Sequence, residues 1–143
     1  MANPVDGVAI GDFNVYIHSA DRLASVGDLA PLKVGDCDFS KAIKLQEIIV
    51  GSDKEGYSNP RLENLTVGNN ELLTLVNVTN CNSPNFKTLD LSGCHGLETL
   101  LAEGTNLTSV NFPNGGHLST VKLPASITSL TIQNQKNIKT LSL

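Results

Sequence analysis

The sequence predicts a strand-rich solenoid in which short parallel strands stack from coil to coil. Three observations lead to this prediction. An apolar-x-x-apolar-x-apolar pattern recurs in nine consecutive segments between Leu45 and Leu143. Alternate segments begin 20–24 residues apart from Leu62 onward, and turn-forming Gly, Asn and Pro lie between the segments. Segments of about ten residues leave room for a strand and a corner but not for a long helix.

The apolar positions of the nine segments follow one another along the chain. They are Leu45-Ile48-Val50, Leu62-Leu65-Val67, Leu73-Val76-Val78, Phe86-Leu89-Leu91, Leu97-Leu100-Ala102, Leu107-Val110-Phe112, Leu118-Val121-Leu123, Ile127-Leu130-Ile132 and Ile138-Leu141-Leu143. A tenth segment, Leu29-Leu32-Val34, is a candidate ahead of them. Alternate segments start 24, 21 and 20 residues apart, both from Leu62 and from Leu73. The unit is therefore a coil of 20–24 residues with two short strands and little helix.

Each segment has inward and outward positions because alternate side chains of a strand face opposite sides. The fourth and sixth positions point inward, and the first turns in from the preceding corner. The outward positions on one side are Asn64, Thr66, Thr88, Asp90, Ser109, Asn111, Ser129 and Thr131. On the other side they are Leu75, Asn77, Thr99, Leu101, Thr120, Lys122, Thr140 and Ser142.

The position three residues after the last apolar residue of a segment resembles the N/C position of the bacterial leucine-rich-repeat signature LxxLxLxxN/C. Asn70, Cys81 and Cys94 occupy it, followed by Thr105, and the candidate tenth segment would place Cys37 there, three after Val34. The resemblance implies a leucine-rich-repeat solenoid over residues 45–143, with this side chain inside the corner supporting the turn. Later segments depart from the signature, which predicts looser or differently built corners. Their residues are Gly115, Ser126 and Gln135.

A second resemblance is to repeat segments of large structural proteins of phages and prophages from gut Firmicutes. The similar stretches are VYIHSADRLASVGDLAPLKVGDCDFSKAIKLQEIIVG (15–51), LENLTVGNNELLTLVNVTNCNS (62–83), LDLSGC (89–94) and FPNGGHLSTVKLPASITSLTIQNQ (112–135). The resemblance implies a virion protein, associated with the tail, in which the solenoid is one piece of a longer chain.

The two ends of the chain differ from the repeat. Residues 1–44 are expected to form a lead-in that caps the first coil, with a strand at 14–19 and a helical turn or two at 19–29. The sequence stops at IKTLSL, within a strand-like segment. An uncapped coil exposes apolar surface and strand edges, so we expect a fragment of a longer chain, or self-association through the C-terminal coil.

Cys94 and His95 are the most obvious chemical candidates, as a thiol beside a base or as half of a metal site. Adjacent side chains of a strand or turn point apart, and no CxxC or HxxxH spacing supplies further zinc ligands. The register instead places Cys94 inside a corner and His95 outside it. GDCD (35–38) lacks the layout of a calcium loop. His18 and His117 are isolated. We therefore expect no catalytic residue, no metal site, no cofactor and no enzyme.

Composition excludes several partners. Charged residues make up 17% and the formal net charge is −4 without a basic cluster, which argues against nucleic-acid binding. No apolar run approaches the roughly 20 residues of a membrane span, and the N-terminus does not resemble a signal peptide. Three cysteines without CxxC spacing predict buried, reduced thiols.

The outward strand positions are the remaining candidate binding surface. We expect contacts through Leu75, Asn77, Thr99, Leu101, Thr120, Lys122, Asp90 and Asn111. The expected function is a non-catalytic module, a spacer or an element of adhesion and protein–protein contact, with other virion subunits or host cell-surface proteins or glycans as partners. The alternative is a bacterial surface or secreted leucine-rich-repeat protein that binds host proteins or glycans. A solvated face stabilised by Thr and Asn ladders is the plain structural interpretation.

Overall fold

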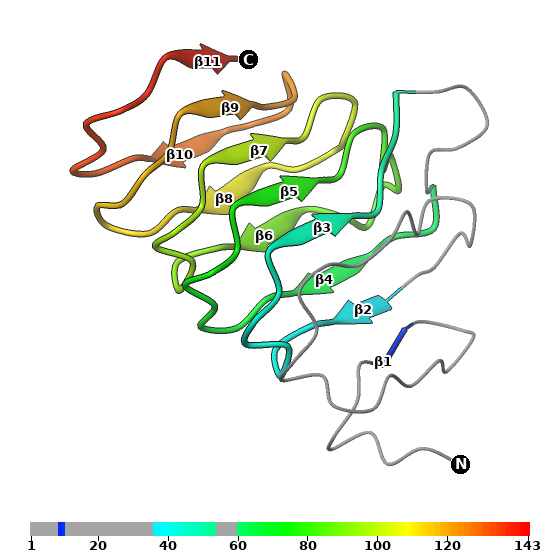
Figure 1. Cartoon of the computed structure of the whole chain (residues 1–143). Helices are drawn as coiled ribbons and strands as arrows, with labels where there is room; N and C mark the ends of the chain where they lie inside the picture. Colours follow the sequence, from blue (N-terminus) through cyan, green and yellow to red (C-terminus); the bar gives the residue numbers. More distant parts are fainter. Residues whose placement is uncertain (1–8, 11–35, 54–59) are drawn as a thin grey trace.

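The computed structural model describes residues 9–10, 36–53 and 60–143. This part of the chain contains short strands joined by turns, and no helix (Figure 1). The strands are β1 Ala9–Ile10, β2 Asp36–Asp38, β3 Glu47–Ile49, β4 Asn64–Thr66, β5 Leu75–Asn77, β6 Thr88–Asp90, β7 Thr99–Leu101, β8 Ser109–Asn111, β9 Thr120–Lys122, β10 Ser129–Thr131 and β11 Thr140–Ser142. The strands expected at 14–19, the helical turns at 19–29 and the segment Leu29-Leu32-Val34 lie outside the described residues.

The strands form two walls that face each other across the core (Figure 1). One wall is a parallel sheet in the order β11-β9-β7-β5-β3, and we call its outer side the five-strand face. The other wall contains β2, β4, β6, β8 and β10, and we call its outer side the split face. In the first wall Thr99, Thr120 and Thr140 pair in register, so successive coils are 21 and 20 residues long. The predicted strand-rich solenoid with two short strands per coil is confirmed.

The core contains the positions that the repeat pattern assigned to it. The central residue of a strand points inward, and in the five-strand wall Val76, Leu100 and Val121 are fully buried. The first and sixth positions pack around them, with Leu97 and Ala102 flanking Leu100. Burying each Leu or Val side chain contributes about 1.5–3 kcal/mol, so the repeated column of apolar residues stabilises the stack of coils.

The split face is interrupted between β4 and β6. These strands lie side by side but belong to separate sheets, β1-β2-β4 and β10-β8-β6 (Figure 1). After β6, the Leu91 amide donates to the Asn111 carbonyl, 2.8 Å away. Val67, at the same position after β4, makes no such bond to the described residues. Hydrogen bonds between strands are therefore continuous along the five-strand wall. The other wall has a break in its strand pairing between β4 and β6, which we call the seam.

The repeat register extends ahead of Leu45. β2 pairs in parallel with β4, and Cys37 lies opposite Leu65, the central residue of β4. The interpretation of Cys37 as a corner residue three after Val34 is therefore wrong: Cys37 is the inward residue of a strand, and Ala42 is the corner residue that follows. The assignment differs because Cys37 and Phe39, rather than Leu32 and Val34, occupy the fourth and sixth positions of the repeat pattern. β1 pairs with β2 in the antiparallel direction.

The last coil is less enclosed than the others. Ile127, Leu130 and Ile138 are only partly buried, although they occupy core positions. Leu141 and Leu143 are 48% and 70% exposed. These side chains occupy inward positions, so their exposure follows from the absence of a further described coil against β10 and β11.

Candidate functional site

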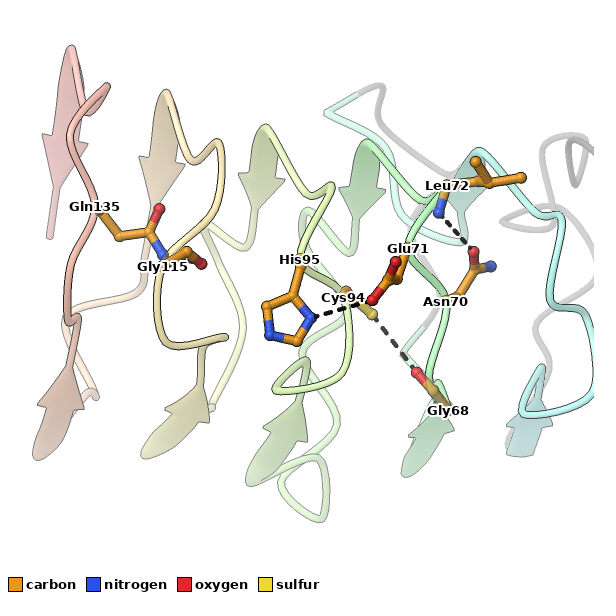
Figure 2. Close-up of polar contacts among 8 residues, drawn as sticks. All are labelled: Gly68, Asn70, Glu71, Leu72, Cys94, His95, Gly115 and Gln135. Carbon is orange, nitrogen blue, oxygen red and sulfur yellow. Dashed lines mark hydrogen bonds and ion pairs between the residues drawn. The ribbon is translucent and has the colours of Figure 1, made fainter.

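Cys94 and His95 do not form a catalytic pair. Cys94 is fully buried, and its thiol donates a hydrogen bond to the Gly68 carbonyl of the preceding coil, with 3.7 Å between sulfur and oxygen. The His95 side chain is 51% exposed, and its Nδ1 lies 3.8 Å from Oε1 of Glu71. Figure 2 shows the thiol and the imidazole directed away from each other. The predicted placement, with Cys94 in the corner and His95 outside it, is confirmed.

The environment of Cys94 makes it a poor nucleophile. Burial raises the pKa of the Cys94 thiol from 9.0 to about 11; a backbone hydrogen bond from Asn70 opposes this effect, and the nearby Asp90 charge adds to it. Because the thiolate is the reactive form, almost none of the reactive species exists at neutral pH. All three cysteines are buried and reduced.

We expect Cys94→Ser to lower the free energy of unfolding by about 1 kcal/mol. The substitution places a polar hydroxyl where a buried thiol makes one long hydrogen bond. His95→Ala, one residue along and exposed, is the matched control and should change stability by less than about 0.5 kcal/mol. Urea denaturation followed by circular dichroism measures both. A larger loss in the His95 variant than in the Cys94 variant would contradict the assigned burial.

The raised pKa of Cys94 also predicts an alkaline effect on stability. The folded state holds this proton more tightly than the unfolded state, so the contribution is fully present below pH 9 and is lost as the pH rises through about 11. Between these values the wild type should lose more unfolding free energy than Cys94→Ala. Parallel urea titrations at pH values across this window test the difference; identical pH dependence of the two chains would refute it.

The corner residue Asn70 supports the turn of the preceding coil (Figure 2). Its Nδ2 donates to the carbonyls of Ala42 at 2.8 Å and Leu45 at 2.9 Å. Its Oδ1 accepts a bond of 3.1 Å from the Leu72 amide. Asn70 is 3% exposed, so its amide joins three backbone groups of two coils from a buried position. The role implied for the N/C position is thus present here.

Gln135 performs the same role later in the same column (Figure 2). Its Nε2 donates to the carbonyls of Pro113 at 3.1 Å and Gly115 at 2.8 Å, and its Oε1 accepts from the Leu118 amide at 3.2 Å. Ser126, in the other corner column, donates to the Leu107 carbonyl at 2.7 Å. The later corners are built differently, as expected, but Ser126 and Gln135 still satisfy the backbone of the coil before them.

The structure places the predicted binding residues on two opposite faces, as the repeat pattern assigned them. Six of them lie on the five-strand face, where register places them in two rows across β5, β7 and β9. The rows are Leu75-Thr99-Thr120 and Asn77-Leu101-Lys122. We call these six residues the grid. Asp90 and Asn111 pair in register on the split face, on the opposite side of the molecule. One ligand contacting a flat face can therefore reach the grid or the Asp90–Asn111 pair, but not both.

Leu75 and Leu101 lie diagonally across neighbouring strands, and both are half-buried. Ile49 lies in the same row as Leu101, since both pair with Asn77, and it is therefore diagonal to Leu75 as well. The sequence reasoning omitted Ile49, although its place after the inward Ile48 was a sufficient signal. The resulting apolar strip crosses β3, β5 and β7 amid polar side chains.

A hollow lies beside the five-strand face, where the turns enter β9 and β11. Its volume is about 380 Å³, and it is lined by Glu98, Thr99, His117, Ser119, Asn137 and Lys139. A smaller hollow of about 220 Å³ lies at the seam between β4 and β6. Sequence reasoning missed the larger one because its residues come from three coils, and His117 by itself carried no signal.

Two further features concern the described residues. No three His, Cys, Asp or Glu side chains among them gather closely enough to hold a metal ion. The same part of the chain contains no helix of the length and hydrophobicity that a membrane span requires.

Comparisons of the chain with protein-family models, curated proteins and solved structures find no match. Inferences about function therefore depend on the solenoid and its surfaces.

Proposed function

We propose that this chain is a non-catalytic leucine-rich-repeat module of a phage or prophage structural protein, tail-associated in the virion, that adheres to host-surface proteins or glycans or to other virion subunits. The observation that carries the proposal is the grid on the five-strand face. It is a flat surface whose position is held by direct pairing of β5, β7 and β9. Rigid sheet positions suit a binding surface because they lose little conformational entropy on contact.

The side chains of the grid support contact rather than simple exposure to solvent. Leu75 and Leu101, with Ile49 beside them, supply an apolar strip, while Asn77 and Lys122 supply polar groups around it. A small apolar strip with a polar rim is the usual composition of a protein-binding patch. A spacer without ligands would need only a solvated surface, so the strip favours adhesion over the spacer role.

Retention of the fluorescently labelled chain on intact Firmicutes cells tests adhesion. Leu101→Lys places a charge in the apolar strip without touching the core and should reduce retention about tenfold, the equivalent of roughly 1.4 kcal/mol. Thr131→Lys, outward and exposed on β10, is the matched control on the split face and should leave retention unchanged. Equal loss in both variants would show a general charge effect, and no retention of the wild type would leave only the spacer role.

Self-association through the C-terminal coil is a further part of this proposal. Leu141 and Leu143 are exposed beside the outer edges of β10 and β11, which suit pairing with the same edges of a second copy. Light scattering should give a molar mass that rises with concentration, and Leu143→Lys should return it to that of the monomer. A wild type that stays monomeric at all concentrations argues against this contact.

A further inference from the structure

The hollow beside the five-strand face is lined only by hydrogen-bonding side chains. Glu98, Ser119 and Lys139 occupy equivalent positions in three successive coils, immediately before β7, β9 and β11. The Ser119 amide donates to the Glu98 carbonyl, and the Lys139 amide to the Ser119 carbonyl, each at 2.8 Å. With neighbouring strands about 4.8 Å apart, Glu98 and Lys139 stand roughly 10 Å from each other. The short Ser119 side chain between them forms the floor.

The hydrogen-bonding groups of this hollow are not used by the protein itself. None of its six lining side chains hydrogen-bonds or ion-pairs with another described residue. Equivalent residues elsewhere do: Thr74 Oγ1 donates to the Gln46 carbonyl at 3.1 Å, and Thr108 Oγ1 to the Lys87 carbonyl at 3.2 Å. In those coils the hydroxyl at this position therefore bonds to a backbone carbonyl. The Ser119 side chain makes no such bond to the described residues, so its hydroxyl stays available to a ligand at the surface.

The chemistry of the lining selects a class of ligand. Thr99 and Ser119 offer hydroxyls, Asn137 offers an amide, and His117 an imidazole, so donors and acceptors surround the hollow. Its volume of about 380 Å³ falls in the range of small-molecule sites, but its lining lacks the apolar side chains such sites use for aromatic or aliphatic ligands. The charges of Glu98 and Lys139 cancel, which favours a ligand without net charge.

We propose that this hollow binds a neutral saccharide unit through its hydroxyl groups, with Glu98 accepting and Lys139 donating at opposite ends. The inference deepens the proposed adhesion and rests on it for its biological meaning, because it names a glycan as the surface ligand. The hollow lies outside the strip Ile49-Leu75-Leu101 and shares only Thr99 with the grid.

The test is a titration of the whole ¹⁵N-labelled chain, followed by NMR, with three probes: N,N′-diacetylchitobiose, galacturonate and glucosamine. Chitobiose should shift the amide signals of residues 98–99, 117–119 and 137–139, together with the Asn137 side-chain amide. Ser119→Leu fills the floor and should weaken the affinity by about tenfold or more. Ser109→Leu, at a half-buried outward position on β8, is the matched control and should bind like the wild type. Should Ser119→Leu fail to fold, Lys139→Met removes one end of the hollow at an exposed position and should weaken binding similarly.

Each other result overturns a defined part of the inference. No shift with any probe, or equal shifts in Ser119→Leu, overturns the site. Tighter binding of galacturonate or glucosamine than of chitobiose overturns the neutral ligand class. If cells retain Ser119→Leu as well as the wild type, the hollow fails as the ligand site and adhesion stands. If cells retain neither chain but chitobiose binds in the hollow, the site stands and adhesion fails.

Discussion

Replacing Leu100 with alanine should lower the free energy of unfolding by about 3 kcal/mol, whereas replacing the adjacent Leu101 should lower it by less than about 1 kcal/mol. Leu100 is fully buried as the central residue of β7, where its loss leaves a cavity between the two walls. Leu101 points outward and is half-buried. The two variants delete the same atoms from neighbouring residues, so the difference between them measures the inward register.

Urea denaturation of both variants with the wild type gives the comparison, provided that the slope of free energy against urea concentration is unchanged. Amide hydrogen exchange adds a local measurement, because a stack of coils can lose one coil's protection before the others unfold. Exchange should accelerate first in the coils around β7 in Leu100→Ala. Equal destabilisation by the two substitutions would mean that β7 is not held with Leu100 inward.

Asn70→Asp should lower the free energy of unfolding by about 4 kcal/mol at neutral pH, since it removes two buried donors and buries a charge. The carboxylate keeps the shape of the amide, but it would face the carbonyl oxygens of Ala42 and Leu45 without a proton to offer. Only its bond from the Leu72 amide survives. The corner should open, and the coil before it should lose its support.

Asn69→Asp is the matched control, because Asn69 is the preceding residue and is exposed. Its effect on the free energy of unfolding should stay within about 0.5 kcal/mol. Thermal and urea denaturation measure both variants, and Asn70→Ala separates the lost hydrogen bonds from the buried charge. A stable Asn70→Asp variant would indicate that water reaches this corner and that the side chain does not support the turn.

Local pattern was sufficient to predict the walls and the core. Val76, Leu100 and Val121 were assigned to the interior because a strand alternates its side chains, and a corner every ten or so residues returns the chain to the opposite wall. The same alternation placed Leu75 and Leu101 outside. The role of Cys94 followed as well, since its place after the last apolar position of a segment is inside a corner.

Other features depended on what the neighbouring coil provides. The sequence marked Gln135 as a departure from the repeat, but only the stacked coils reveal that its longer amide reaches the Pro113 and Gly115 carbonyls as Asn70 reaches its own partners. Cys37 was assigned to a corner because a cysteine suits both a corner and an inward strand position. Its pairing with Leu65 of β4 selects the inward position. The seam between β4 and β6 likewise has no counterpart in the apolar pattern.

The sequence by itself determined the period, the two walls and the inward column of this solenoid, because those depend on the alternation of side chains within one short segment. Tertiary structure decided which surface residues lie together. It set the pairing between strands that aligns the six grid residues in two rows, whereas the alternation of the repeat had already assigned Asp90 and Asn111 to the other side. It also brought Glu98, His117 and Lys139 from three coils around one hollow. Such contacts depend on the exact register between coils, which spacing along the chain alone does not encode.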